Sequence, residues 1–343
     1  MDISFNNLKE LEERYSGMKS KGFNLDLTRG KPSDTQLDLS NEIDGILLKS
    51  FVSGGVDIRN YGNLKGLPGC RELGAKILGF PSRNVIAGGN SSLTLMSQYL
   101  MSLFLHGSGK GSWGLDKRTT FLCPSPGYDR HFKLCEEFGI NMIPVPLTGE
   151  GPDIDYIKKI SKADNSIKGI WCVPKHSNPT GDIYSEKCIR GLLELNNQLE
   201  GEFKIFWDNA YAVHDFLPCT SLPNIFDLAT ELGYLDSVVA FASTSKITFA
   251  GGGVSFIALS ENNLDLFLKH YSSVTIGPDK VNQARHELFF KTYEDLELHM
   301  QKHAEIIRPK FEIVDKWLSL QNYGSWTKPS GGYFVSFNTK PGL

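Results

Sequence analysis

Short apolar runs alternate with amphipathic stretches through the middle of the chain. Three of these runs are 167–174 (IKGIWCVP), 203–207 (FKIFW) and 237–242 (SVVAFA). Apolar runs of this length between helix-like segments are typical of buried parallel strands that helices connect. The pattern therefore predicts an α/β fold with a mostly parallel central sheet.

Polar residues follow each of the three runs. They are KHSNPTG at 175–181, DNAY at 208–211 and STSK at 243–246. In open α/β sheets, ligands bind just beyond the carboxyl ends of the strands. Three polar clusters in that position predict one shared site.

The segment from Pro278 to about Leu320 has the pattern of one long helix. Proline lacks a backbone donor, so we expect a break or kink at Arg308–Pro309, and we place the passage between two domains there. Beyond it, Gly331–Gly332 predicts a turn and 333–335 (YFV) a strand.

Two histidines, His299 and His303, are four residues apart on this predicted helix. Their neighbours are mainly Glu, Lys and Gln, with no further metal-ligand pattern. We interpret them as part of a solvated helix face and expect no metal site.

Composition and charge narrow the class of protein. The chain has 343 residues, a net charge of −3 and 40% hydrophobic residues. This gives no electrostatic reason to expect nucleic-acid binding, and no apolar run is long enough to predict a membrane span. Segment 1–14 lacks the apolar core of a signal peptide. Six cysteines without CxxC spacing predict free thiols in a reducing compartment, hence a cytoplasmic protein.

Lys246 is the first candidate for chemistry. It follows Ser243 and Ser245 and precedes the glycine run 251–253. A partly desolvated lysine has a lowered pKa and can act as a nucleophile or form a Schiff base. Taken alone, the pattern fits a surface lysine on a turn better, because lysine is common.

Asp208, at the end of an apolar run, is the second candidate. A carboxylate there is costly unless it meets a cation or a donor. The ring nitrogen of pyridoxal 5′-phosphate (PLP) is one such partner, and Tyr211 could reach the same ligand. The alternative is that Asp208 caps a following helix.

The third candidate is the stretch 86–94 (IAGGNSSLT), which leads into an apolar helical pattern. Small and hydroxyl residues at a helix N-terminus form a ready anion site, because free N–H groups and the helix dipole favour negative charge. With a lysine and an aspartate elsewhere, this stretch becomes a candidate phosphate-binding loop.

Taken in order, these motifs resemble those of fold-type I PLP-dependent aminotransferases. The sequences of 25–33 (LDLTRGKPS) and of the Lys246 region are most similar to those of the aspartate aminotransferase subgroup related to MocR-type regulators. The resemblance implies a Schiff base on Lys246, with Asp208 and Tyr211 as further catalytic residues. It implies these cofactor contacts: Gly89, Asn90, Ser91, Tyr128, Asn178, Asp208, Tyr211, Ser243, Ser245, Lys246 and, from the partner subunit of a homodimer, Tyr61.

The resemblance also implies an architecture. It is the three-layer PLP-transferase fold, with a large domain over 44–300 and a smaller α+β domain formed by 1–43 and 301–343. Two departures from the family pattern stand out. Val254 occupies the position of a phosphate-pairing arginine, and the sequence ends at Leu343, before the arginine that clamps the substrate α-carboxylate. We therefore expect an incomplete small domain and impaired turnover.

The implied reaction is ping-pong transamination of an amino acid with a 2-oxo acid, aspartate with 2-oxoglutarate. Gly30 and Asn178 are expected to contact substrate. Arg29 and Lys31 either bind the distal carboxylate or are surface charges. The alternatives are another aminotransferase specificity, a β-lyase, or a PLP-binding sensor module without turnover. The sensor is disfavoured because only about 40 residues precede the shared domain and they contain no basic recognition helix.

Overall fold

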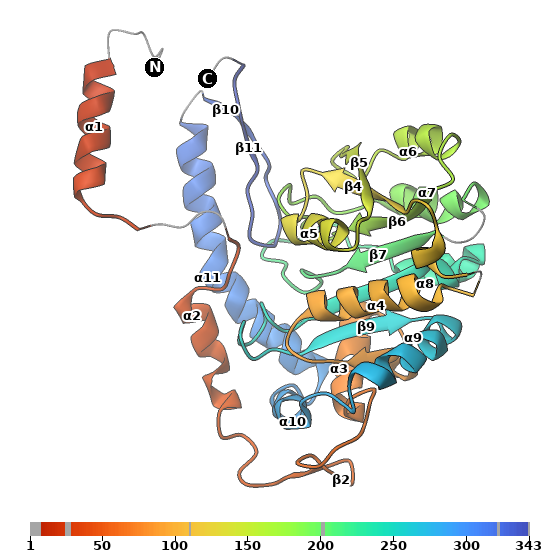
Figure 1. Ribbon diagram of the computed structural model, residues 1–343. Coiled ribbons are helices and arrows are strands. Elements are labelled where there is room, and N and C mark those ends of the chain that lie inside the picture. Colours follow the sequence, from red (N-terminus) through yellow and green to blue (C-terminus); the bar gives the residue numbers. More distant parts are fainter. Residues whose placement is uncertain (1–7, 25–28, 110, 200–202, 321–322, 342–343) are drawn as a thin grey trace.

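The computed structural model describes residues 8–24, 29–109, 111–199, 203–320 and 323–341. Its central sheet consists of β3 (Val85–Ala87), β4 (Thr120–Ser125), β5 (Asn141–Pro146), β6 (Ile167–Cys172), β7 (Lys204–Asp208), β8 (Val238–Ser243) and β9 (Ser255–Leu259). The spatial order is β3-β9-β8-β7-β6-β4-β5 (Figure 1). β9 pairs antiparallel with β8 and β3, and the pairings among β4, β5, β6, β7 and β8 are all parallel. The predicted fold class is confirmed.

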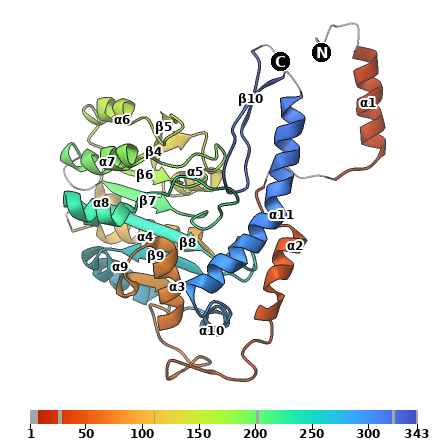
Figure 2. The ribbon, with the colours of Figure 1, turned by 180° about the vertical axis from the view of Figure 1, so that it is seen from behind.

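Helices cover both faces of this sheet, which gives three layers. One apolar cluster packs α4 (Ser92–His106), α5 (Asp129–Glu137) and α9 (Glu261–Val274) against one face. The other face is covered by α3 (Pro68–Leu78), α6 (Ile154–Ser161), α7 (Glu186–Glu194), α8 (Ile225–Leu232), α10 (Lys280–Phe289) and the first part of α11 (Tyr293–Ser319) (Figure 2). Because both faces are buried, the strands are apolar throughout, as the sequence pattern requires.

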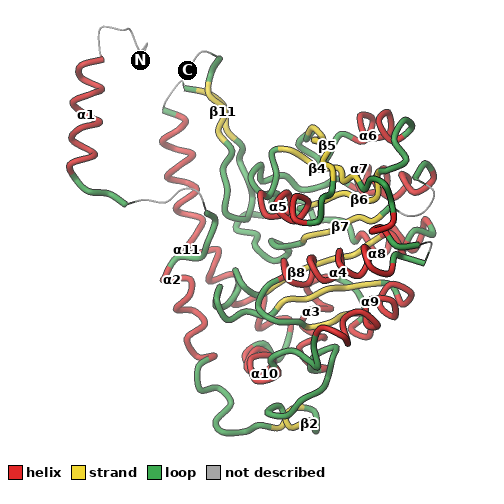
Figure 3. The backbone as a smooth tube through the Cα atoms, viewed as in Figure 1, coloured by secondary structure: helices red, strands yellow, loops and turns green. Residues whose placement is uncertain are grey.

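The remaining elements lie near the two ends of the chain and in its connections. They are α1 (Leu8–Ser20), α2 (Asp34–Leu37), the hairpin β1 (Val52–Ser53) and β2 (Val56–Asp57), and the hairpin β10 (Gly324–Trp326) and β11 (Phe337–Thr339). Short 3-10 helices are Asp38–Ile43, Ser82–Asn84, Trp113–Leu115, Leu195–Asn197 and Leu235–Ser237. Figure 3 shows α1 apart from the rest of the described chain, and none of its residues is buried.

The expected division into domains stays a proposal. We propose that 44–300 form the large domain, because the seven-stranded sheet lies within that range. The β10–β11 hairpin lies in 301–343, and α2 lies in 1–43. The boundary at residue 300 falls inside α11, so one continuous helix would connect the two domains.

Of the break or kink expected at Arg308–Pro309, the break is wrong, although Figure 2 shows α11 change direction along its length. α11 runs through Pro309 without interruption, and the helix boundary lies instead between α10 and the capping box at Thr292. The carbonyl of Glu305 has no helical donor, because Pro309 has no N–H. Glu305 and Pro309 are both exposed. Water can therefore satisfy that carbonyl, and the helix tolerates the proline.

Two further expectations at this end of the chain are wrong. His299 and His303 are on a helix, but they are only 6% and 2% exposed, so they do not belong to a solvated face. The segment 333–335 is not a strand, and the strand begins at Phe337. The residues just before 333–335 bond the loop after β7 instead. Ser330 O accepts from Phe216 N, and Gly332 N donates to His214 O.

The cysteines are free thiols, as expected. Five are buried and Cys219 is half-buried. None of the helices that the structure describes is both long and apolar enough to cross a membrane.

Candidate active site

A cavity of about 330 Å³ opens at the carboxyl ends of β6, β7 and β8. These three strands are neighbours in the sheet, so the three polar clusters meet there as the pattern indicated. The lining residues are Asn90, Ser91, Ser92, Leu93, Tyr128, Val173, Asn178, Asp208, Ala210, Tyr211, Ser243, Ser245, Lys246 and Ala250. Nine of the residues that the sequence proposed for a cofactor site therefore surround one cavity.

Lys246 belongs to the turn that follows β8, and its side chain opens onto the cavity. Its Nζ lies 4.9 Å from the centroid of the Tyr211 ring. Desolvation by the surrounding protein lowers the pKa of Lys246, and the charge of Asp208 partly opposes this. A lowered pKa increases the unprotonated fraction that a nucleophilic amine needs.

Asp208 ends β7 and is 4% exposed. Its Oδ2 accepts a hydrogen bond from His131 Nε2 at 3.0 Å, while among the described residues its Oδ1 has no hydrogen-bond partner. The residues after Asp208 form a turn, and the next α-helix begins only at Ile225, so the interpretation as a helix cap is wrong. A buried carboxylate oxygen without a donor is costly, and the protonated ring nitrogen of PLP is a donor that would satisfy it.

His131 is a site residue that the sequence analysis missed. Its ring stacks on Trp171 at 4.4 Å and contacts the Tyr128 ring edge-on at 5.0 Å. Because Nε2 faces a carboxylate, we assign its proton to that nitrogen. His131 and Asp208 are 77 positions apart in the sequence, and no local pattern connects them.

Two tyrosines flank the amine and the carboxylate. Tyr211 is 2% exposed, and burial followed by the charge of Asp208 raises its pKa well above the usual value. Burial, with a further contribution from Asp208, also raises the pKa of Tyr128. Both phenols therefore keep their protons at neutral pH and can act as hydrogen-bond donors.

The N-terminus of α4 lines one side of the cavity. The N-cap, Ser91, makes no side-chain cap bond. The nearby carbonyls are already used, because Gly89 O accepts from Ser255 N (2.7 Å) and Asn90 O from Ser245 Oγ (3.0 Å). The first turn of the helix presents its N–H groups and its positive dipole end to the cavity, although Thr94 N also donates to Ser91 O at 3.2 Å.

Lys246 is the one lysine or arginine among the lining residues. Val254 does not line the cavity; its side chain is 1% exposed in the core, and its N–H donates to Thr244 Oγ1. A phosphate group would thus be held by backbone N–H groups and hydroxyls.

Five proposed residues lie outside the cavity lining, namely Arg29, Gly30, Lys31, Tyr61 and Gly89. Tyr61 is 82% exposed. Arg29 Nη1 contacts both carboxylate oxygens of Asp129 at 3.3 Å, beside Tyr128. A Cβ added at Gly30 would lie 2.5 Å from Phe334 Cζ, so this close approach requires glycine.

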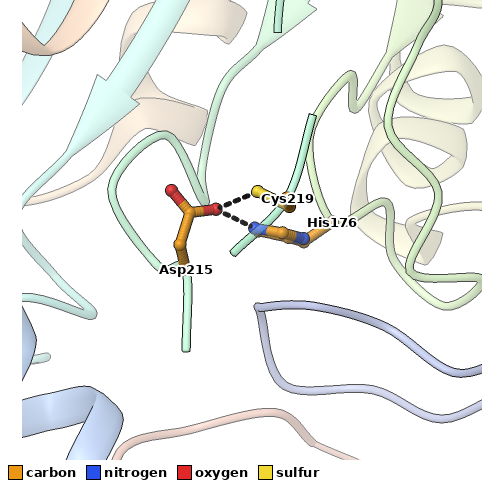
Figure 4. A group of neighbouring side chains, drawn as sticks. All are labelled: His176, Asp215 and Cys219. Atoms are coloured by element: carbon orange, nitrogen blue, oxygen red, sulfur yellow. Dashed lines mark hydrogen bonds and ion pairs between the residues drawn. The ribbon is translucent and has the colours of Figure 1, made fainter. Parts of the chain in front are cut away.

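Asp215 is a second feature that the sequence analysis missed. Figure 4 shows His176 and Cys219 pointing at its carboxylate; the bond from His176 Nε2 is 2.7 Å and that from Cys219 Sγ is 3.1 Å. Lys175 Nζ donates to the other oxygen at 2.7 Å. Among the described residues, His176, Asp215 and Cys219 are the one group of candidate metal ligands. Since both carboxylate oxygens already accept hydrogen bonds, we assign the cluster a structural role.

A family model for aspartate amino-transferases matches residues 2–343. The chain belongs to this family of fold-type I PLP-dependent aminotransferases. The aminotransferase is 46% identical to a protein of Mycolicibacterium smegmatis named as an aminotransferase, over 97% of this chain and 80% of that protein.

Two solved structures extend the comparison. An aspartate transaminase from Corynebacterium glutamicum superposes on the aminotransferase with a TM-score of 0.91 at 38% identity, and the match covers 100% of this chain and 83% of that one. An α-aminoadipate aminotransferase from Thermus thermophilus, solved with N-(5′-phosphopyridoxyl)-L-leucine, has a TM-score of 0.73 at 22% identity over 92% and 76% of the chains. The second likeness concerns the fold alone.

Proposed function

We propose that this aminotransferase binds PLP through Lys246 and transfers the amino group of aspartate to 2-oxoglutarate by a ping-pong mechanism. One observation carries the proposal: a single cavity joins an amine of lowered pKa, a buried carboxylate with an unpartnered oxygen, and a helix N-terminus. When bound, PLP withdraws electrons from the substrate α-carbon and carries the amino group between the two substrates.

The chain supplies a partner for each part of the cofactor. Asp208 Oδ1 would accept the proton of the ring nitrogen, and His131 would hold the other carboxylate oxygen in place. Tyr211 and Asn178 would donate to the phenolic oxygen, and Tyr128 would stack on the ring. The phosphate would lie at the N-terminus of α4, near the hydroxyls of Ser91, Ser243 and Ser245 and the backbone of Gly89 and Asn90.

Lys246 has two tasks in this proposal. Its unprotonated Nζ would hold the cofactor through the aldehyde group. With a substrate bound, the same Nζ would take the proton from the substrate α-carbon and later return a proton. The lowered pKa of Lys246 favours the unprotonated amine that both tasks need.

The substrate pair is proposed from the name of the C. glutamicum relative, which is 39% identical, and from the guanidinium of Arg29, which lies beside Tyr128 of the cavity lining. Arg29, now paired with Asp129, would bind the distal carboxylate of aspartate, and Gly30 and Asn178 would contact the substrate. The test is to supply aspartate and 2-oxoglutarate and to measure oxaloacetate and glutamate. Release of pyruvate and ammonia instead would establish the β-lyase alternative.

We also propose a homodimer in which Tyr61 reaches the cofactor phosphate of the partner subunit. Tyr61 is 82% exposed in the isolated chain, which leaves its hydroxyl available to another subunit. We expect Tyr61→Phe to retain PLP more weakly during dialysis, because the phosphate loses a donor. Mixing Tyr61→Phe with Lys246→Ala chains should restore activity, because the hybrid dimer contains one intact site.

Tyr156→Phe is the matched control, since Tyr156 is also exposed but lies on α6. It should retain PLP like the unsubstituted protein. An active species that is monomeric at the assay concentration, or mixtures no more active than their components, would contradict the shared site.

A further inference from the structure

The turn that carries Lys246 has two main-chain carbonyls bonded to histidine side chains. His214 Nε2 lies 3.2 Å from Lys246 O, and His299 Nε2 lies 2.8 Å from Ile247 O. Buried carbonyls outside regular secondary structure need a donor from elsewhere. Here the donors come from the loop after β7 and from α11.

Gln36 fixes the proton position on a third histidine, His303. Gln36 Oε1 accepts from Ser33 N at 3.1 Å, so its amide Nε2 faces His303 Nδ1 at 3.2 Å. An amide nitrogen only donates, so His303 Nδ1 must be unprotonated, and the neutral ring carries its proton on Nε2.

His299 must carry its proton on Nε2 as well, because that atom faces the Ile247 carbonyl. The same carbonyl is also a hydrogen-bond partner of His303. Two Nε2–H groups therefore converge on one oxygen, which has two lone pairs, and the 3.1 Å between the two Nε2 atoms is a contact between donors. Burial lowers the pKa of His299 and lowers that of His303 to about 4, so both rings are neutral at neutral pH.

The network continues to both ends of the chain. Gln36 Nε2 also donates to Tyr333 Oη at 3.1 Å, and Gly332 N donates to His214 O at 3.0 Å. The space enclosed by these residues is only about 10 Å³, the lower limit for one water molecule. The polar groups must therefore satisfy one another, and a shift of one changes the bonds of the next.

We propose that His299 and His303 are positioning residues for Lys246. They hold the peptide that follows the lysine and so fix the direction of its side chain into the cavity. Through Gln36 they also connect that peptide to Tyr333, near the other end of the chain. This inference rests on the proposed role of Lys246, but its structural part concerns histidine protons and can be tested without turnover.

The first test compares His303→Leu with His303→Gln, which retains an N–H group at the ε position. In the PLP-loaded protein, His303→Leu should lower kcat on the order of tenfold with little change in KM, because the lysine is misdirected. It should also shift the pH midpoint of the cofactor absorbance change. His303→Gln should recover most of both. His303→Leu with an unchanged kcat and midpoint, or His303→Gln no better than His303→Leu, would overturn the proposal.

His270→Leu is the control. His270 lies on α9, is about as buried as His303, and bonds Gln98 Oε1 of α4 at 3.0 Å, away from the Lys246 turn. It should lower the melting temperature without moving the absorbance midpoint. A midpoint shift in this control as large as that of His303→Leu would show a general effect of destabilisation and would overturn the positioning role.

The second test needs neither activity nor a stable variant. Nitrogen-15 NMR of the histidine-labelled, PLP-loaded protein at neutral pH should show His299 and His303 both protonated on Nε2. A proton on Nδ1 of either ring would overturn the inference. The two proposals can fail separately: a protein that carries no pyridoxyl group on Lys246 contradicts the proposed function, whereas a labelled Lys246 with the wrong histidine protons contradicts only this inference.

Discussion

Replacing Lys246 by alanine should lower turnover by roughly 10³-fold or more, while the protein stays folded and retains PLP non-covalently. The large loss is expected because one amine both binds the cofactor covalently and moves the substrate proton. The measurement is the aspartate half-reaction, followed by the cofactor absorbance. Lys175→Ala is the control for losing a lysine near the cavity, since Lys175 Nζ bonds Asp215 and Ala212 O. Half-reaction rates within tenfold of the unsubstituted protein would contradict the role of Lys246.

The same variant has a stability signature in the cofactor-free protein. Because desolvation lowers the pKa of Lys246 in the folded state, the unfolded chain binds more protons between the folded-state pKa and the ordinary lysine pKa of 10.5. Unfolding free energy therefore rises with pH through that window in the unsubstituted protein. Lys246→Ala lacks this pH dependence. At neutral pH its free energy of unfolding should exceed that of the unsubstituted protein, and this difference should shrink as the pH approaches 10.5. A stability difference that instead grows with pH would contradict a lowered pKa of Lys246.

Asp208→Asn should lower the half-reaction rate by about 10²-fold or more, while PLP stays at least partly bound. Asparagine retains the shape and can still accept from His131, but it lacks the charge that keeps the ring nitrogen protonated. Electrostatic stabilisation of this kind counts most where charge develops in the transition state. Melting curves and half-reaction rates, measured on the same preparation, separate lost charge from lost packing.

Asp164→Asn is the matched control, because Asp164 bonds Ser166 and Arg118 just before the amino end of β6, whereas the cavity lies at the carboxyl ends of the strands. It should lower stability slightly and leave the half-reaction unchanged. A rate for Asp208→Asn within threefold of the unsubstituted protein would exclude the proposed role of Asp208.

Much of the site follows from local sequence patterns. β6, β7 and β8 begin and end within two residues of the predicted runs, because strands buried on both faces must be continuously apolar. The polar residues at or just after the carboxyl end of each parallel strand then lie at the same edge of the sheet. For this reason Asn178, Asp208 and Lys246 could be placed together before any tertiary contact was known.

The interactions that the sequence did not predict depend on residues far apart in the chain. His131 meets Asp208 only because α5 packs on the sheet beside β7. His299 and His303 have charged neighbours in the sequence, yet they are buried because Gln36 and Ile247 are packed against that face of α11. Burial of a helix face by an N-terminal segment and by the turn that carries Lys246 overrides its local polarity.

Pro309 shows a related limit. Its effect on a helix depends on whether the carbonyl one turn earlier is exposed to water, and that is a property of the packed molecule. The local rule predicted a break or a kink, and the exposure of Glu305 removes the reason for a break.

The covalent attachment of PLP to Lys246 is the central claim, and borohydride reduction followed by peptide mapping tests it most directly. Reduction of the PLP-loaded protein should place one pyridoxyl group on the peptide that contains Lys246. Lys175, the other lysine at a strand end near the cavity, should stay unlabelled, because its Nζ is bonded to Asp215. A pyridoxyl group on Lys175 or on any lysine other than Lys246 would contradict the account.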